Sequence, residues 1–194
     1  MDEAFVNFTV IFLCEITTLP VLPQYRQAQP SDAIDIAALL VRVWQQNYRQ
    51  FLPAEFLEQL TTQGRVGLVE NLLRQPQSQT WLAHDQEQLI GFVNTGRSRD
   101  PDVPRRTTAE LRALYLDPDM TGGGLGGQLL DKALRALRQQ GFVSLNLWVL
   151  ENNEQGIKFW LKHGFKADGC HRREERDGVE LKQVRLHRLL NKAI

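Results

Sequence analysis

The sequence has few cysteines and no excess of charge, and each absence excludes a class of protein. Cys14 and Cys170 are the two cysteines in 194 residues, too few for a disulfide framework, and neither belongs to a C-x-x-C pair. We therefore expect two unpaired thiols and a reducing compartment, the cytoplasm. The 23 basic and 23 acidic residues give a formal net charge of +0, whereas proteins that coat nucleic acid or an anionic membrane carry a basic excess. No nucleic-acid or membrane partner is therefore expected.

Metal-ligand spacing and long apolar runs are missing as well. The four histidines are scattered along the chain, at His84, His163, His171 and His187. Because metal ligands recur at short, fixed spacings, we predict no metal site. The apolar run Phe8–Cys14 is too short to span a bilayer, and Asp2 and Glu3 stand where an export signal is positively charged. We expect residues 1–23 to form an N-terminal extension and residues 24–194 to form one domain.

The residues that are present can fill an ordinary core, and their order predicts helices first. The chain is 42% hydrophobic, which is typical of a globular domain. The apolar positions of the first predicted helix recur at the spacing of one helical face, at Ile36, Leu39, Leu40 and Val43. Ser31 is predicted to cap that helix. Two more helices are predicted over residues 54–60 and 66–73.

The rhythm then changes to short apolar runs, which predict strands. These runs cover residues 80–84, 89–95, 109–116, 144–150, 165–170 and 179–189. Helices are predicted after the glycine run at residues 122–127 and from Asn153 onward. Residues 97–106, with two prolines, are predicted to form an exposed loop, and the charged run 172–176 a solvated one. The order indicates one α+β domain around a mixed sheet.

The glycine run is the most informative segment. A strand that ends at Leu116, a tight turn, the glycines and a helix would place several backbone N–H groups around one anion. Three ligands fit this arrangement differently. Gly122, Gly124 and Gly127 satisfy the dinucleotide pattern G-x-G-x-x-G, but no acidic strand end follows about 20 residues later. A Walker loop would need Gly-Lys-Ser/Thr, which is absent. The pyrophosphate of coenzyme A is the third ligand, and a glycine turn without function is the remaining alternative.

Thr121–Gly126 resembles the pyrophosphate loop of the GNAT superfamily of N-acetyltransferases, Arg/Gln-x-x-Gly-x-Gly/Ala. It matches at Gly124 and Gly126 and departs at Thr121. Residues 110–118 resemble the strand that precedes this loop in the family, and residues 147–165 resemble the strand and helix that follow it. With residues 26–53, the likeness extends over about residues 24–189. The resemblance implies a single domain with a central mixed, mostly antiparallel sheet flanked by helices, in which the strands before and after the loop splay apart.

The same resemblance implies acetyl-CoA as the co-substrate and no metal. It places the cofactor against Leu114, Tyr115, Leu116, Thr121, Gly122, Gly123, Gly124, Leu125, Gly126, Gly127, Asn153, Phe159 and Trp160. Backbone groups of Leu114 and Leu116 would contact the pantetheine arm, and the Leu116 N–H would polarise the thioester carbonyl. For Asn153, a plain helix N-cap is the alternative role.

Glu110 is the residue that the resemblance identifies as the base for the amine proton. A carboxylate partly removed from water is a better base, and an exposed strand-end glutamate is the alternative interpretation. The sequence does not identify the acid that protonates the leaving thiolate. Trp160 stands where a tyrosine is common in the family, and an indole N–H cannot reprotonate a thiolate. Tyr48, Tyr115 or water remain as candidates.

The resemblance implies an N-acetyltransferase. Because Cys170 lies on a late predicted strand without a nearby base, we expect direct attack of a primary amine in a ternary complex and not transfer through an acyl-cysteine. The sequence does not identify the amine acceptor. The resemblance implies that the walls of the acceptor site come from about residues 43–56 and 171–180. A catalytically degenerate acetyl-CoA sensor and an acyltransferase for longer acyl-CoA are the alternatives. The protein is expected to be a monomer or a homodimer.

Overall fold

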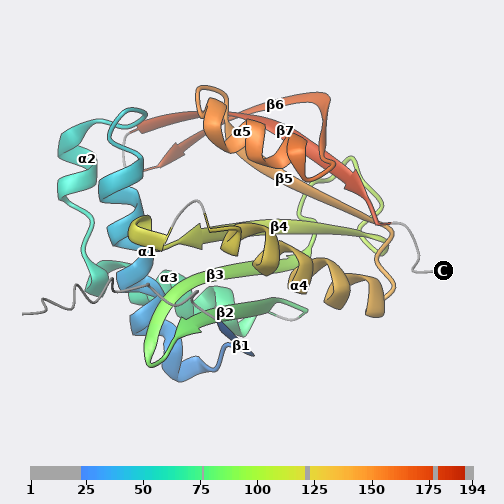
Figure 1. Cartoon of the computed structure of the whole chain (residues 1–194). Helices are drawn as coiled ribbons and strands as arrows, with labels where there is room; N and C mark the ends of the chain where they lie inside the picture. Colours follow the sequence, from blue (N-terminus) through green and yellow to red (C-terminus); the bar gives the residue numbers. More distant parts are fainter. Residues whose placement is uncertain (1–22, 76, 121–122, 177–178, 191–194) are drawn as a thin grey trace, which may run out of the picture.

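In the computed structural model, which describes residues 23–75, 77–120, 123–176 and 179–190, seven strands form one mixed sheet (Figure 1). The strand order is β1-β2-β3-β4-β5-β7-β6, and all neighbours are antiparallel except the pair β4 and β5. The strands are β1 (Gln24–Gln27), β2 (Gln79–Asp85), β3 (Gln88–Arg97), β4 (Thr108–Leu116), β5 (Ser144–Leu150), β6 (Lys166–Arg176) and β7 (Val179–Leu189). The predicted α+β domain with a mixed, mostly antiparallel sheet is confirmed.

Helices cover both faces of the sheet, because each presents one apolar stripe to it. On one face α1 (Ala33–Asn47) and α3 (Thr62–Arg74) pack with Leu82 and Phe92, and α2 (Ala54–Glu58) lies beside α1. On the other face α4 (Leu125–Gln139) buries Leu130, Ala133, Leu134 and Leu137, and α5 (Glu154–Lys162) contributes Trp160. Each fully buried leucine contributes roughly 1.5–3 kcal/mol.

Strands β4 and β5 separate part of the way along their length. Their parallel pairing is recorded from Thr108↔Ser144 to Leu111↔Leu147. Beyond that point β4 continues along β3 to Leu116, while β5 stays paired with β7 as far as Leu150. The gap between the two strands is visible in Figure 1. The predicted splay of the strands on either side of the glycine run is therefore confirmed.

Of the two segments that we predicted to be solvated loops, residues 98–106 form a loop that is exposed at Pro101, Asp102 and 104–106 but buried in part, and residues 172–176 form a strand. Within residues 97–106, Ser98 is fully buried and Asp100 is 8% exposed, because the segment folds back against β5 and β7. The charged run 172–176 is the second half of β6, paired with β7 from Arg172↔Gln183 to Arg176↔Val179. Charged side chains suit that position, since β6 is the edge strand of the sheet.

The start of the first helix also differs from the prediction. A 3₁₀ turn, Pro30–Asp32, with Gln29 as its cap, precedes α1, and the N-cap of α1 is Asp32 instead of Ser31. The Asp32 carboxylate accepts a hydrogen bond from the Gln29 N–H at 2.6 Å and pairs with Arg26 at 2.7 Å. The Arg26 hydrogen bond lowers the pKa of Asp32, although partial burial acts in the opposite direction.

Residues 1–22, including Cys14, lie outside the described residues, so the N-terminal extension stays a prediction. None of the helices in the described ranges is long and apolar enough to cross a bilayer. Within those ranges no cluster of three or more His, Cys, Asp or Glu side chains is placed to hold a metal ion.

Candidate active site

The gap between β4 and β5 opens into a cavity of about 640 Å³. This volume lies within the ~300–1,000 Å³ range of ligand sites. Residues 110–116 of β4 and 147–150 of β5 form two of its walls, and residues 43–51 and Phe159 close it. Of the predicted cofactor residues, the structure brings Leu114, Tyr115, Leu116, Gly126, Asn153, Phe159 and Trp160 to this cavity.

The glycine run continues the cavity at the N-terminus of α4. Gly124 has a φ of 81°, a left-handed conformation that favours glycine, and a Cβ at Gly123 or Gly124 would meet nothing within 4 Å. The space before these residues is therefore open to a ligand. The first N–H groups of an α-helix lack intrahelical partners and carry a partial positive charge, so the loop fits the pyrophosphate of coenzyme A.

Other members of the run have packing roles. A Cβ at Gly126 would lie 3.2 Å from the Phe159 ring, and one at Gly127 would lie 3.1 Å from Nε2 of His163. Leu125 is 6% exposed and packs in the core, so its backbone is the part that faces the loop. Thr121 and Gly122 lie outside the described residues, and their predicted contacts stay predictions.

The edge of β4 that faces the gap carries backbone groups without a strand partner. The Asp117 N–H donates to the Ile90 carbonyl of β3 at 2.9 Å. Because N–H groups alternate sides along an antiparallel strand, those of Leu116 and Leu114 face away from β3, toward the gap. An extended ligand chain could pair with this edge as an added strand does.

Asn153 is the N-cap of α5. Its Oδ1 accepts a hydrogen bond from the Gly156 N–H at 2.9 Å, so the helix-cap role is confirmed. The side chain also lines the cavity, and a cofactor contact through its amide stays a prediction. Trp160 is 8% exposed and packs edge-on against Phe159 and Phe165, at centroid distances of 4.9 and 5.3 Å.

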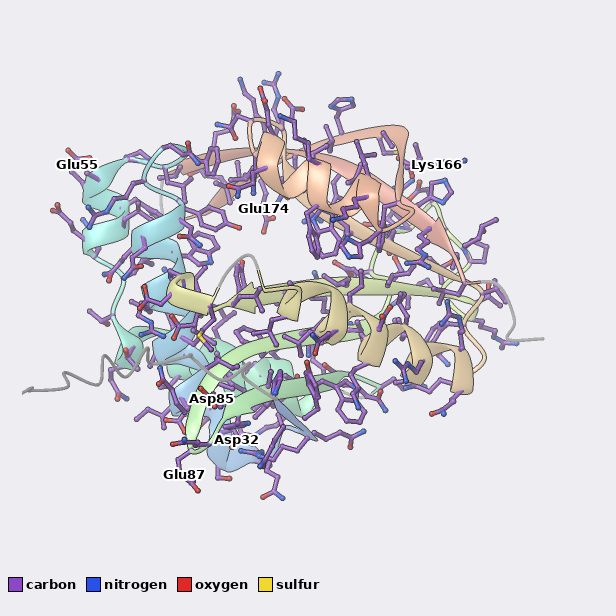
Figure 2. All side chains as sticks on the ribbon, viewed as in Figure 1. Asp32, Glu55, Asp85, Glu87, Lys166 and Glu174 are labelled. Atoms are coloured by element: carbon purple, nitrogen blue, oxygen red, sulfur yellow. The ribbon has the colours of Figure 1, made fainter. Side chains whose placement is uncertain are left out.

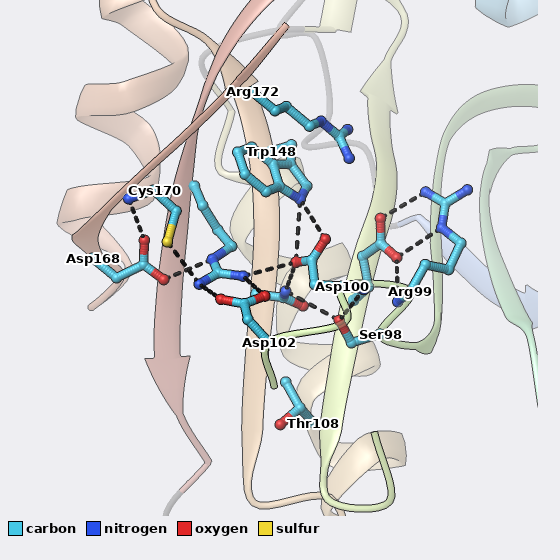
Figure 3. A network of polar contacts seen from close by, with 12 residues as sticks. Ser98, Arg99, Asp100, Asp102, Thr108, Trp148, Asp168, Cys170 and Arg172 are labelled. Atoms are coloured by element: carbon cyan, nitrogen blue, oxygen red, sulfur yellow. Dashed lines mark hydrogen bonds and ion pairs between the residues drawn. The ribbon is translucent and has the colours of Figure 1, made fainter. Parts of the chain in front are cut away.

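Glu110 is buried at the inner end of the cavity. It is 2% exposed, so the alternative of an exposed strand-end glutamate is wrong. Its Oε1 accepts from Arg99 Nη2 at 2.6 Å, and its Oε2 accepts from Arg99 Nε at 2.9 Å. Figure 3 shows this bidentate pair. The hydrogen bond to Glu110, more than any other contact, raises the pKa of Arg99.

Arg112 lies on the same face of β4 as Glu110, two residues further along. Its side chain is 7% exposed, and its Nε lies 4.0 Å from Oε2 of Glu110. Nη1 donates to Gln75 at 2.5 Å and Nη2 to the Arg97 carbonyl at 3.0 Å. Sequence reasoning missed both Arg99 and Arg112. The Glu-x-Arg spacing on a predicted strand was the available signal for Arg112, since alternate residues share a face.

A buried ion cluster holds the segment that carries Arg99 (Figure 3). Asp100 accepts from Trp148 Nε1 at 3.1 Å, from Arg185 Nη1 at 3.2 Å and from the Asn146 side-chain amide. Arg185, 6% exposed, also pairs with Asp102 at 2.6 Å and Asp168 at 2.7 Å. The hydrogen bond to Asp102, more than any other contact, raises the pKa of Arg185.

Cys170 belongs to the same cluster as an acceptor. Its Sγ lies 2.9 Å from Arg185 Nη2. Partial burial raises the pKa of the thiol, against the effect of the Arg185 charge. Since the thiolate is the nucleophilic form, Cys170 is poorly suited to carry an acyl group.

Two tyrosines from opposite walls face the cavity. Tyr48, at the end of α1, stacks on Trp44 at a centroid distance of 4.9 Å. Burial raises the pKa of Tyr48 well above its ordinary value, and the neighbouring Tyr115 adds to the effect. Tyr48 therefore keeps its proton at neutral pH.

Comparisons with known proteins agree with this geometry. A family model described as the acetyltransferase (GNAT) family matches residues 39–165. A peptidyl-lysine N-acetyltransferase of Escherichia coli is 31% identical over 135 residues, 67% of this chain and 76% of that protein. An N-acetyltransferase of Methanocaldococcus jannaschii is 31% identical over 77 residues, but the match spans only 34% of that relative's length and 40% of this chain.

A solved N-acetyltransferase structure has a similar fold. The crystal structure of the PaiA N-acetyltransferase of Thermoplasma acidophilum in complex with coenzyme A superposes with a TM-score of 0.65, at 21% identity over 86% of this chain and 98% of that one. The family match covers more than half of the sequence, from α1 to the end of α5. The chain therefore belongs to the acetyltransferase (GNAT) family, as an N-acetyltransferase.

Proposed function

We propose that the protein transfers an acetyl group from acetyl-CoA to a primary amine by direct attack, with Glu110 as the base. The observation that carries this proposal is the buried Glu110 carboxylate at the inner end of the cavity that the separated strands form. A base must lie within hydrogen-bond reach of the proton that it removes, and an amine bound in this cavity could reach Glu110.

The residues of this chain divide the binding of acetyl-CoA between them. The N-terminus of α4 and Gly123–Gly126 would hold the pyrophosphate, and the open edge of β4 at Leu114 and Leu116 would pair with the pantetheine arm. Asn153, Tyr115, Phe159 and Trp160 would line that arm, with Thr121, Gly122 and Gly127 completing the loop. The bound cofactor supplies an acetyl thioester.

The reaction is balanced without any further reagent. The amine nitrogen forms a bond to the acetyl carbon, the carbon–sulfur bond breaks, and the amine proton is lost to Glu110. The thiol leaves with one proton, so an amine and a thioester become an amide and a thiol. The Leu116 N–H faces the gap and is suited to hydrogen-bond the developing oxyanion. Tyr48, which stays protonated, or Tyr115 can donate a proton toward the sulfur.

Direct attack is favoured over a route through an acylated cysteine. Cys170 is hydrogen-bonded by Arg185 and is held as a neutral thiol by burial. It also sits in the cluster on the far side of Asp100 from Glu110, where no histidine is among its hydrogen-bond partners in the described residues. A ternary complex needs no such nucleophile.

One observation favours the second candidate function, an acetyl-CoA sensor without turnover. In this structure Glu110 is paired with Arg99 through both oxygens, and a carboxylate held in this way must loosen that pair before it can accept a proton. Transfer of a longer acyl group in place of acetyl is a further alternative, which assays with longer acyl-CoA test.

The variant Glu110→Gln tests the proposal. We expect calorimetric titration to give wild-type affinity for acetyl-CoA, because residue 110 lies at the inner end of the cleft, away from the glycine run. We expect thiol release over a panel of amines to fall by roughly 10²–10⁴-fold, the usual contribution of a general base. Glu70→Gln on the surface of α3 is the matched control and should change neither value. Unchanged turnover across pH would show that Glu110 is not the base, and binding without turnover by the wild-type protein on every amine would favour the sensor.

A further inference from the structure

A second, smaller cavity lies on the α1 and α3 face of the sheet, next to the first. Its volume is about 190 Å³, below the ~300 Å³ at which drug-sized ligands fit. Trp44, Arg99, Arg112, Ala113 and Tyr115 line both cavities, so the two spaces adjoin, and Glu110 lines the first of them. A small acceptor could therefore occupy the second cavity while its amine faces the first.

The lining of this cavity is apolar and cationic. Most of the surface is aromatic or aliphatic, with side chains such as Trp44, Phe56, Leu60, Leu72 and Phe92. Of the described residues that line it, the charged ones are Arg65, Arg99 and Arg112, and none is acidic. Three of the carboxylates labelled in Figure 2, Asp32, Asp85 and Glu87, lie on the β1–β3 side of the sheet and line neither cavity.

The guanidinium groups at the junction of the cavities outnumber their carboxylates. Glu110 forms ion pairs with both Arg99, at 2.6 Å, and Arg112, at 4.0 Å. Arg172 has its own partner, Glu174, at 3.6 Å. Asp100 is already bound by Asn146, Trp148 and Arg185. The charge of Arg112 is therefore not matched by a carboxylate of its own.

Arg112 is also incompletely hydrogen-bonded. Its Nε is buried and has no hydrogen-bond partner among the described atoms, and the side chain is 7% exposed. Burial lowers the pKa of Arg112, and the neighbouring Arg99 lowers it further. A buried charge without full compensation is costly, and an anionic ligand group in the adjoining cavity would remove this cost.

The pyrophosphate of the cofactor is not the anion in question. Arg112 and Glu110 lie four and six residues before Leu116, where β4 leads toward the glycine run. At about 3.3 Å per strand residue, these positions are roughly 13 and 20 Å from that end of the strand. The unmatched charge of Arg112 therefore lies at the end of the cavity where we expect the acceptor, and not at the pyrophosphate end.

We propose that the acceptor is an α-amino acid with an apolar side chain, whose carboxylate is bound by Arg112 and Arg99 while its amine faces Glu110. The 4.0 Å between Arg112 Nε and Glu110 Oε2 requires the amine and the carboxylate to be close together, as they are on one α-carbon. The apolar side chain occupies the 190 Å³ cavity. This inference rests on the proposed function and names its acceptor.

Binding of such an acceptor also releases the base. The incoming carboxylate competes with Glu110 for the Arg99 guanidinium, and Glu110 becomes available to the amine. The amine nitrogen then bonds to the acetyl carbon, the thioester carbon–sulfur bond breaks and the nitrogen proton goes to Glu110. The sulfur takes up one proton, so that an N-acetyl amino acid and coenzyme A thiol are formed. Polyamines, with no carboxylate and several positive charges, are disfavoured beside three arginines.

The test compares leucine with leucinamide and phenylalanine with phenylalaninamide, because the amide has the size of the acid without its charge. We expect thiol release with the wild-type protein to give a kcat/KM at least about 10-fold higher for each acid. Calorimetry in the presence of coenzyme A should show the same preference in binding. The lost charge-assisted hydrogen bonds in Arg112→Gln should reduce kcat/KM for leucine by roughly 10–100-fold and remove the preference. Arg135→Gln on the exposed face of α4 is the matched control and should retain it.

The outcomes separate this inference from the proposed function. Turnover with spermidine or a blocked lysine peptide, without a preference for the acids over their amides, would overturn the acceptor and keep the N-acetyltransferase. Binding of leucine in preference to leucinamide without thiol release would support the acceptor site and count against the proposed catalysis. Since the acid–amide comparison uses the wild-type protein, it holds even if Arg112→Gln fails to fold.

Discussion

Replacing Arg185 by methionine would test whether the buried ion cluster holds the segment that carries Arg99. Methionine keeps the apolar stem of the side chain and removes the guanidinium. The variant leaves Asp100 with its Asn146 and Trp148 donors but without a counter-ion, in a place where its side chain is 10% exposed. Asp168, 21% exposed, loses its bond at 2.7 Å as well.

The expected cost follows from those contacts. Breaking a buried pair by removing one partner costs about 3–5 kcal/mol, and the two remaining donors to Asp100 place the loss near the lower end, at roughly 3 kcal/mol. For a protein of this size each kcal/mol lowers the melting temperature by about 2–4 °C. We therefore expect Tm to fall by roughly 6–12 °C at pH 7.

The loss of stability in the variant should become smaller as the pH falls. The Arg185 hydrogen bond lowers the pKa of Asp102, and at Asp168 the hydrogen bonds from Cys170 and Arg185 lower the pKa against an opposing effect of burial. A lowered native pKa stabilises the fold above the unfolded pKa of about 3.9, and this stability is lost as the pH falls through the native value. The difference between wild type and variant should be constant above about pH 5 and shrink below about pH 4.

Denaturant unfolding at several pH values measures this difference, with Arg135→Met on the exposed face of α4 as the control. A loss below about 1 kcal/mol at pH 7, or a loss that stays the same at pH 3.5, would refute the reasoning. Thiol release by the variant, assayed well below its Tm, should also fall, because the 98–102 segment no longer holds Arg99 against Glu110.

Two further predictions concern the cofactor. Gly124→Ala and Gly141→Ala both place a Cβ at a positive φ, of 81° and 85°, with nothing within 4 Å, and each should cost about 1–2 kcal/mol of stability. Only Gly124→Ala should weaken coenzyme A binding in calorimetry. Equal coenzyme A affinities of the two variants would show that the loop is not part of the binding site. Asn153→Asp keeps the cap of α5 and should retain stability, whereas Asn153→Ala should lose about 1 kcal/mol. If the Asn153 amide donates to the cofactor, coenzyme A affinity should fall in both variants, and wild-type affinity in Asn153→Asp would leave capping as its role.

The sequence was most informative where local pattern and tertiary structure agree. The glycine run, the apolar stripe of α4 and the doubly apolar strand β5 were predictable, because chain conformation and burial there follow from neighbouring residues. Gly141 and Gly164 follow α4 and α5 at φ values of 85° and 79°, and a glycine directly after a helical run is a sequence signal for a helix end.

The errors arose where distant residues decide the outcome. Residues 97–106 contain prolines and charges typical of a loop, but Asp100 is buried by Arg185, which lies 85 residues later. The same holds for Glu110: its place on a strand was predictable, whereas its ion pair with Arg99 depends on how that segment folds back. Composition predicts a loop over residues 172–176, because it does not show that β7 pairs with them.

The short pairing of β4 with β5 gives the sheet a mechanical property. Strands β1–β4 form one ladder and β5–β7–β6 another, and four residue pairs, from Thr108↔Ser144 to Leu111↔Leu147, join them. If the two ladders rotate relative to each other, those pairs are the hinge at the closed end of the wedge, and the mouth can widen without breaking a hydrogen bond in either ladder. Glu110, paired with Asn146 in register, sits at the hinge, where displacement is smallest. The chemistry would then take place at the stiffest point of a site whose outer end can open to release its products.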